Sequence, residues 1–175
     1  MNDQKNYDFV IYGASGFTGK LVVEYAIAKY LDSEDISWAI AGRNIDKLNE
    51  LKKELNISDQ IEVLHVDSDD QSSVESLVKN TKCVLTTVGP YQLYGENIIR
   101  SCISSGTDYV DLCGEPGWMH KIIDECSEEA KSTGARIIFS CGFDSITFDL
   151  GVQVVQDEVM SKTNQYASSV KGRVR

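Results

Sequence analysis

Three glycines near the amino terminus have the spacing of a phosphate-binding loop. The segment Gly13-Ala14-Ser15-Gly16-Phe17-Thr18-Gly19 follows an apolar run at 9–12 and precedes a helix-like run from Lys20 to about Tyr30. A buried strand that enters a glycine-rich turn and then a helix is the first part of a dinucleotide-binding βαβ unit. In such a unit the phosphates contact the unpaired N–H groups and the positive dipole end of the helix. We therefore predict that residues 13–19 bind a pyrophosphate group.

The position of each glycine suits this role. Gly13 would let the chain turn sharply at the strand end, where a side chain would obstruct the turn. Gly16 would let backbone N–H groups approach the pyrophosphate, and Gly19 would let the helix pack closely on the sheet. The spacing is one residue longer than G-x-G-x-x-G. A glycine-rich turn that binds no ligand is therefore the alternative.

The end of the second apolar run indicates which dinucleotide is preferred. An NAD site places Asp or Glu there to accept from the ribose 2′-hydroxyl, whereas Arg accommodates the 2′-phosphate of NADP. Here the run at 36–41 ends in Gly42-Arg43, and no acidic residue follows before Asp46. Arg43 can donate charge-assisted, bidentate hydrogen bonds to a phosphate, so we predict NADP(H) in preference to NAD(H). The alternative is that Arg43 is a solvated surface charge.

Two further segments are expected at the same edge, because ligands bind outside the carboxyl ends of the strands where the strand order reverses. Gly89, Pro90 and Tyr91 follow the fourth apolar run and would border the ribose and nicotinamide. Their alternative role is that of a rigid turn. Asp67 follows the third run and is expected either to border the adenine or to cap a turn.

Other motifs carry catalytic residue types at less suitable positions. Tyr25 and Lys29 match the Tyr-x-x-x-Lys pair of short-chain dehydrogenases, but the first helix would hold them out of reach of a nicotinamide. His65 and His120 are isolated, and we expect a strand histidine with its own partners and a surface histidine. Asp144 is expected to serve a helix start or catalysis. The sequence therefore identifies no catalytic residue.

The hydrophobic pattern supplies the elements that would position these residues. Short apolar runs typical of buried strands alternate with segments of helical spacing, the last of them carrying Ile146, Leu150, Val154 and Val155. The strand-like runs lie at 9–12, 36–41, 61–66, 83–88, 109–112 and 136–140. This alternation predicts an α/β fold, a Rossmann-like doubly wound parallel sheet of about six strands in the order 3-2-1-4-5-6 with helices on both faces.

The length of 175 residues leaves room for one full α/β domain. We expect a dinucleotide-binding domain over residues 1–160. Residues 161–175 contain four basic residues and no acidic one. We expect this segment to be a tail or the start of a second, substrate and dimerisation domain.

Composition excludes several functional classes. The net charge of −10 argues against a nucleic-acid partner, because affinity for nucleic acid depends on basic residues that neutralise phosphates. The five cysteines form no C-x-x-C pair and no metal-ligand spacing, so we expect no metal and buried, reduced thiols. No apolar run is long enough to cross a membrane, and the amino terminus is too polar for a signal peptide. We expect a cytoplasmic protein, and association of a longer protein with a membrane or lipid droplet stays open.

Five motifs occur together in this order. They are Gly-Ala-Ser-Gly-Phe-Thr-Gly at 13–19, Ala-Gly-Arg at 41–43, Val-Gly-Pro-Tyr at 88–91, Cys-Gly-Glu-Pro at 113–116, and Gly-Phe-Asp-Ser at 142–145 followed by Asp149-Leu150-Gly151. With these motifs the chain resembles the saccharopine dehydrogenase-like oxidoreductases, which include the mycobacterial trans-acting enoyl reductases. The resemblance covers about residues 7–160 and is looser to the true saccharopine dehydrogenases of lysine metabolism.

The resemblance implies a Rossmann cofactor domain followed by a substrate and dimerisation domain, so that the full-length protein would be a homodimer. It implies cofactor contacts at Gly13, Gly16, Gly19 and Arg43, and a nicotinamide-side lining at 89–91. The implied reaction is hydride transfer between NADP(H) and a small-molecule or lipid-like substrate, such as a lipid-linked enoyl or carbonyl group. This chain would be the cofactor-binding part and inactive alone. The alternatives are a non-catalytic dinucleotide-sensing module and a true saccharopine dehydrogenase.

Overall fold

The computed structural model describes residues 5–31 and 33–174. The first four residues of the predicted domain at 1–160 and the last residue of the predicted tail at 161–175 lie outside the described residues. Residue 32, within the domain, does so too.

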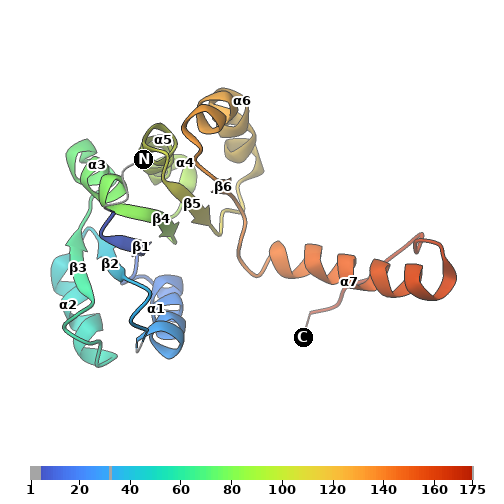
Figure 1. Cartoon of the computed structure of the whole chain (residues 1–175), viewed down its shortest axis with the longest axis horizontal. Helices are drawn as coiled ribbons and strands as arrows, with labels where there is room; N and C mark the ends of the chain where they lie inside the picture. Colours follow the sequence, from blue (N-terminus) through green and yellow to red (C-terminus); the bar gives the residue numbers. More distant parts are fainter. Residues whose placement is uncertain (1–4, 32, 175) are drawn as a thin grey trace.

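One parallel sheet organises the chain. Its six strands lie in the order β3-β2-β1-β4-β5-β6 (Figure 1), which confirms the predicted doubly wound topology. The strands are β1 (Tyr7–Tyr12), β2 (Trp38–Gly42), β3 (Glu62–His65), β4 (Thr81–Thr86), β5 (Asp108–Asp111) and β6 (Ile137–Ile138). The order reverses between β1 and β4, so the loops that follow these two paired strands turn to opposite faces of the sheet, at the edge where such sheets bind ligands.

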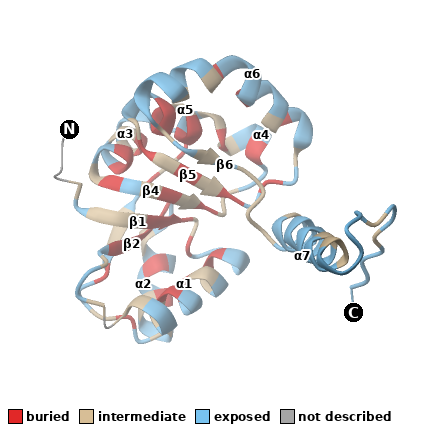
Figure 2. Cartoon of the chain, turned by 45° about the vertical axis from the view of Figure 1, so that its right-hand side comes forward, coloured by how far each residue is buried: buried red, intermediate tan, exposed pale blue. Residues whose placement is uncertain are grey.

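Helices cover both faces of the sheet. The first two helices lie on one face, and the helices between β3 and β6 lie on the other (Figures 1 and 2). The helices are α1 (Phe17–Tyr30), α2 (Ile45–Glu54), α3 (Gln71–Asn80), α4 (Tyr91–Tyr94), α5 (Glu96–Ser105), α6 (Pro116–Thr133) and α7 (Ile146–Thr163).

The alternation of side chains along each strand divides the core into two clusters. Ile11 of β1 packs with Val23 of α1 and Leu48 of α2, whereas Val10 packs with Ile99 of α5 on the opposite face. Successive side chains of a strand point to opposite faces, and here both faces are covered. This arrangement explains why the central strands are continuous apolar runs in the sequence.

Each strand differs from its predicted range by one or more residues at one or both ends, and three element boundaries have consequences for the site or a clear physical reason. β6 covers residues 137–138 rather than 136–140, because Ser140 adopts a left-handed φ of 60° that an extended strand does not allow. β4 ends at Thr86 rather than at Val88, whose N–H donates back to the Thr86 hydroxyl at 3.2 Å. α1 begins at Phe17, one turn earlier than expected.

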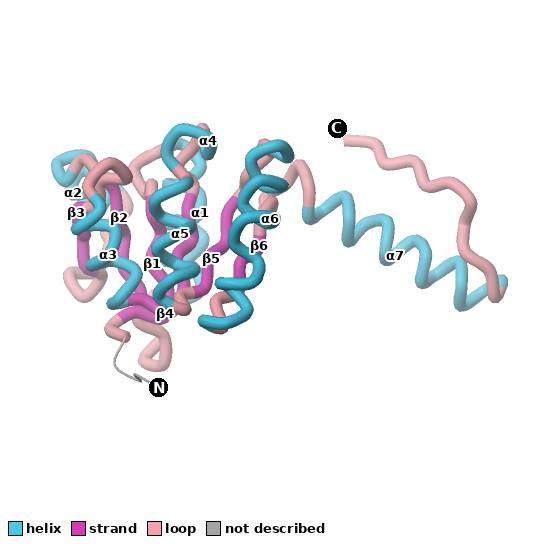
Figure 3. Tube along the Cα trace, turned by 90° about the horizontal axis from the view of Figure 1, so that it is seen from above, coloured by secondary structure: helices cyan, strands magenta, loops and turns pink. Residues whose placement is uncertain are grey.

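α7 extends away from the sheet (Figures 1 and 3). Every described residue of this helix is exposed or half-buried, including the apolar side chains of Phe148, Leu150 and Val154. The chain after Asn164 turns back along the helix (Figure 3), and the Gln156 side chain bonds the backbone N–H and C=O of Ala167 at 2.8 and 3.1 Å. The sequence predicted this helix but did not show that it lies apart from the sheet.

The contact between α1 and the preceding loop leaves no space for a side chain at Gly19. A Cβ there would lie 2.1 Å from the Gly13 carbonyl oxygen and 2.8 Å from the Ala14 Cα. We expect Gly19→Ala to lower the free energy of unfolding by roughly 3 kcal/mol, because both neighbours are backbone atoms that must shift. Urea denaturation measures this change.

A matched control is Gly117→Ala on α6, where no described heavy atom other than those of its chain neighbours and its own helix backbone lies within 4 Å of the added Cβ. We expect that variant to be as stable as the wild type or slightly more stable, since Ala favours a helix over Gly. Equal stability of the Gly19 and Gly117 variants would contradict the close-contact explanation.

Candidate dinucleotide-binding site

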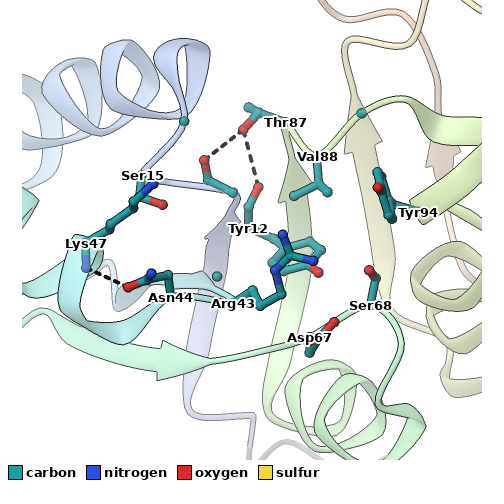
Figure 4. Close-up of a pocket in the computed structure, with 14 residues that line it drawn as sticks. Tyr12, Ser15, Arg43, Asn44, Lys47, Asp67, Ser68, Thr87, Val88 and Tyr94 are labelled. Atoms are coloured by element: carbon teal, nitrogen blue, oxygen red, sulfur yellow. Dashed lines mark hydrogen bonds between the residues drawn. The ribbon is translucent and has the colours of Figure 1, made fainter.

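A cavity of about 310 Å³ lies at the carboxyl edge of the sheet, where the loops after β1 and β4 turn to opposite faces (Figure 4). Its walls come from the loops after β1, β2, β3 and β4, which is where a doubly wound sheet binds its ligand. The lining residues are Tyr12, Gly13, Ser15, Gly16, Gly42, Arg43, Asn44, Lys47, Asp67, Ser68, Thr87, Val88, Gly89 and Tyr94.

The loop between β1 and α1 forms the wall that would face a pyrophosphate. Gly13 has a φ of +91°, and a Cβ at this position would lie 2.7 Å from the Val88 side chain. Gly16 is the N-cap of α1, and no described side chain caps this helix. The first N–H groups of α1 are therefore available to an anion, and the helix dipole favours negative charge at the same point. Phosphate binding by this loop stays a prediction, and an exposed, uncapped helix start is the geometry that it would need.

The end of β4 holds this loop from the side. The Thr87 N–H donates to the Tyr12 carbonyl at 2.9 Å, and the Thr87 hydroxyl is shared between the carbonyls of Tyr12 and Gly13 at 3.4 and 3.2 Å (Figure 4). The Gly13 carbonyl also accepts from the Gly16 N–H at 3.0 Å. These bonds join the end of β4 directly to the loop after β1, so the distance between these two walls of the cavity is fixed.

The end of β2 brings two cationic side chains to the cavity. Arg43 follows the strand directly, and Lys47 lies in the first turn of α2; both are exposed and line the cavity (Figure 4). Asn44 caps α2, with its side-chain oxygen accepting from the Lys47 N–H at 3.0 Å. This cap fixes the start of α2 and therefore the place from which the Lys47 side chain extends.

Asp67 both caps a turn and lines the cavity. Its side chain accepts from the Asp69 N–H at 3.1 Å, and its own N–H donates to the Ser73 hydroxyl at 3.1 Å. The neighbouring Ser68 is buried and lines the cavity as well. Burial raises the pKa of Tyr12, so its hydroxyl remains protonated beside these groups.

The structure separates the predicted contact residues into two groups. Gly13, Ser15, Gly16, Arg43, Asp67 and Gly89 line the cavity. Ala14 and Gly19 are buried between α1 and the sheet, Tyr91 is buried in the core, Phe17 is 86% exposed, Thr18 lines a neighbouring cavity, and Pro90 is exposed next to Gly89. A role of each as a cofactor contact stays a prediction, and for the second group it would require contact outside this cavity.

Sequence reasoning missed several lining residues. Lys47 had a usable signal, because it lies three residues after the N-cap Asn44 and one helical turn after Arg43. Ser68 had the signal of following Asp67 at the end of β3. Tyr94 had none, since the four-residue helix α4 is too short for a periodic pattern.

The residues set aside as non-catalytic lie outside the cavity lining. Tyr25 and Lys29 are exposed on α1. His65 is exposed on β3, and His120 is exposed on α6, where it contacts Asp124 at 3.0 Å. Asp144, whose expected role is a helix start or catalysis, is exposed just before α7 and lines a neighbouring cavity, so both roles stay predictions.

The part of the chain that the structure describes contains no cluster of three or more His, Cys, Asp or Glu residues suited to a metal ion. Cys102, Cys113 and Cys126 are buried free thiols, as predicted, whereas Cys83 and Cys141 are half-buried. Among the described helices, none is both long and apolar enough to cross a bilayer.

Asp111 links the loops after β5 and β6 beside the site. This carboxylate is 3% exposed and accepts from the N–H groups of Cys113 and Ser140 at 2.9 and 2.8 Å and from the Tyr109 hydroxyl at 2.9 Å. Burial raises the pKa of Asp111 above its ordinary value of 3.8, and the three hydrogen bonds only partly oppose this effect.

The family of the chain follows from comparison with known proteins. Residues 9–138 match the family model described as the saccharopine dehydrogenase NADP binding domain. The chain belongs to this family. The family is defined by an NADP-binding domain, which agrees with the cavity at the carboxyl edge and its phosphate loop.

Longer relatives support the same assignment. The chain is 38% identical over 172 residues to a lipid droplet localized protein of Caenorhabditis elegans, covering 94% of this chain and 40% of that protein. It is 36% identical over 167 residues to a saccharopine dehydrogenase-like oxidoreductase of Mus musculus, covering 90% and 39%. It is 40% identical over 151 residues to a trans-acting enoyl reductase of Mycobacterium leprae, covering 86% of this chain and 35% of that protein. The chain thus spans about two fifths of the length of these relatives.

Solved structures confirm the fold. Saccharopine dehydrogenase (L-Glu forming) of Saccharomyces cerevisiae matches with a TM-score of 0.68 at 20% identity, covering 89% of this chain and 32% of that one. The triphenylmethane reductase of Citrobacter sp. complexed with NADP(H) matches with a TM-score of 0.55 at 16% identity, covering 86% and 55%. At these identities the likeness is one of fold.

The environment of Asp111 predicts a pH effect on stability. The pKa of Asp111 is higher in the folded chain than in the unfolded chain, so as pH rises the unfolded chain loses this proton first. The contribution of Asp111 to the free energy of unfolding therefore falls as pH rises between the two pKa values. Asp111→Asn stays neutral, and its side-chain oxygen can still accept the two backbone hydrogen bonds. We expect the stability of this variant relative to wild type to increase from about pH 4 to pH 7 in urea titrations.

Asp108→Asn is the control with the opposite sign. Burial raises the pKa of Asp108, but hydrogen bonds from the Arg136 side chain and N–H outweigh burial and lower it overall. The stability of this variant relative to wild type should therefore stay nearly constant from about pH 4 to pH 7 and increase as the pH falls below about 4, where wild type loses the contribution of the Asp108 carboxylate. A flat pH dependence for the Asp111 variant would contradict the prediction.

Proposed function

We propose that the cavity binds NADP(H) in preference to NAD(H) and that the chain is the cofactor-binding part of an oxidoreductase. The reaction of this proposal is hydride transfer to or from a small-molecule or lipid-like substrate, with an enoyl or carbonyl group as the acceptor. The chain supplies the binding and orientation of the dinucleotide, and the nicotinamide supplies the hydride when bound.

The pair of cations at the end of β2 carries the proposal of NADP(H) preference. Arg43 and Lys47 line the adenosine side of the cavity, and the position where an NAD site has an acidic residue is occupied by Gly42-Arg43. A 2′-phosphate would receive charge-assisted hydrogen bonds from both side chains. Such bonds are worth roughly 1.5–3 kcal/mol. Both side chains are exposed, so we take the lower end, equivalent to about tenfold in affinity.

The rest of the cavity suits the remaining parts of the cofactor. The uncapped start of α1 would bind the pyrophosphate, and the side formed by Thr87, Val88 and Gly89 would border the nicotinamide ribose. Asp67 and Ser68 would border the adenine end. The cavity therefore offers cationic, anion-binding and largely uncharged walls in the order in which the parts of NADP(H) are joined.

The names of the relatives support the substrate class of the proposal. The Mycobacterium leprae relative is called a trans-acting enoyl reductase, and the Caenorhabditis elegans relative is called lipid droplet localized. On the basis of these names, we propose that the substrate of this protein is a lipid with an enoyl or carbonyl group. A cytoplasmic location with access to lipid surfaces and assembly as a homodimer belong to the same proposal.

Ligand-induced stabilisation tests cofactor binding. We expect NADPH and NADP to raise the melting temperature of the chain more than NADH and NAD at matched concentrations. A ligand present at 100 times its dissociation constant adds about 2.7 kcal/mol to the stability of the folded state. The absence of a shift with all four dinucleotides would refute the proposed function, and a larger shift with NADH and NAD would refute the preference. An activity assay of the whole protein distinguishes an enzyme from a module that binds the dinucleotide without turnover. NADPH oxidation with an enoyl-lipid acceptor would indicate the proposed reductase, and turnover with saccharopine would indicate a saccharopine dehydrogenase.

Substitution of Arg43 tests how the preference arises. We expect Arg43→Ala to weaken NADPH binding about tenfold and to leave NADH binding unchanged, since only NADPH carries the 2′-phosphate. Lys47→Ala should act in the same direction. Isothermal titration measures both constants. Lys131→Ala, which removes an exposed lysine on α6, is the matched control. Equal losses of NADPH and NADH affinity in the Arg43 variant would contradict a phosphate contact.

A further inference from the structure

The Cys-Gly-Glu-Pro segment at 113–116 contains a residue that reaches across to the cavity wall. Glu115 accepts hydrogen bonds from two successive backbone amides, with Oε1 bound to the Tyr91 N–H at 2.7 Å and Oε2 bound to the Gln92 N–H at 2.9 Å. Bonds from both oxygens of one carboxylate fix direction as well as distance. Glu115 therefore holds the backbone at the start of α4.

This contact determines where two lining residues lie. Gly89 precedes α4 and Tyr94 ends it, and both line the cavity. A helix of four residues has little stability of its own. Its N-cap is Pro90, which makes no side-chain cap within the described structure, so the Glu115 carboxylate takes the place of a local cap.

Tyr91 supplies a second attachment of a different kind. Its buried ring packs on Trp118 with centroids 5.8 Å apart, and its hydroxyl donates to the Thr86 carbonyl at 3.3 Å. These contacts hold the side chain of Tyr91. The backbone next to this side chain could still rotate. Among the described side chains, Glu115 is the one that bonds the Tyr91 and Gln92 amides and so restrains this rotation.

Glu115 is itself held in place by α6. Its carbonyl accepts from the N–H groups of Trp118 and Met119 at 3.0 and 3.1 Å, and its own N–H donates to the Cys113 sulfur at 3.4 Å. The side chain thus extends from a fixed backbone and is half-buried. It is not among the residues that line the cavity.

We propose that Glu115 is a positioning residue that keeps Gly89 and Tyr94 in register with the nicotinamide half of the bound dinucleotide. This inference rests on the proposed binding of NADP(H). The adenosine half contacts the loops after β2 and β3, which Glu115 does not touch. Loss of the carboxylate should therefore weaken binding of the whole cofactor and leave binding of its adenosine half intact.

Glu115→Gln tests this separation with two ligands. Glutamine has the same shape, but its NH₂ group would face one of the two N–H donors and repel it. We expect the affinity for NADPH to fall about tenfold, equivalent to roughly 1.4 kcal/mol. The affinity for adenosine 2′,5′-bisphosphate, which lacks the nicotinamide half, should stay within about twofold of wild type. Isothermal titration gives both values.

Two further variants complete the test. Glu115→Asp keeps the charge on a shorter side chain and should recover part of the NADPH affinity. Glu128→Gln removes an exposed carboxylate from the same helix and should change neither affinity. Equal losses for both ligands would show a general structural role and overturn the inference, as would unchanged NADPH affinity. Failure of the wild type to bind either ligand would refute the proposed function itself, so the two failures are distinguishable.

Discussion

The contact between the amino end of α1 and the Gly13 carbonyl oxygen determines the geometry of the site. This oxygen accepts from the Gly16 N–H and the Thr87 hydroxyl, and it lies 2.1 Å from the position that a Cβ of residue 19 would take. One carbonyl group thereby joins the turn, the helix and β4. Replacement of any of these partners by a bulkier group would move the uncapped N–H groups of α1 away from the edge of the sheet. The close approach is therefore what places an anion-binding helix end at the point where the strand order reverses.

Local arrangement, rather than overall charge, determines what the cavity attracts. The chain has a net charge of −10, which by itself would repel an anionic cofactor. Arg43 and Lys47 line the cavity on the side that we propose for the adenosine, and the dipole of α1 adds a partial positive charge beside the loop after β1. At physiological ionic strength, charges more than about 8 Å apart are largely screened. Acidic residues farther than this from the cavity therefore weigh less than these two cations, whereas Asp67 lines the cavity and opposes them locally.

Much of this arrangement could be predicted from sequence, because strand period and glycine spacing are local properties. They predict the sheet order, which the structure confirms, and they place residues 13–19 and Arg43 at the carboxyl edge, where Gly13, Gly16 and Arg43 line the cavity. Tyr91 shows the limit, since its place after β4 predicted a lining residue, whereas contacts with Trp118 and Thr86 bury it. The short β6 depends on the backbone of Ser140 and its bond to Asp111, 29 residues earlier. Glu115 and Tyr91 meet only through tertiary packing, so no spacing along the chain could have revealed their bond.

The separation of α7 from the sheet has a consequence for the timing of motion in this protein. A helix without buried side chains is stabilised by its own backbone bonds and by the segment folded back on it. An isolated helix of this kind exchanges with coil in about a microsecond or less. The sheet strands, in contrast, open only with the cooperative unfolding of the core. Residues 139–145 connect β6 to α7 and are bonded to Asp111 through Ser140. We therefore expect the boundary between rapid opening of α7 and slow opening of the sheet to fall in this segment.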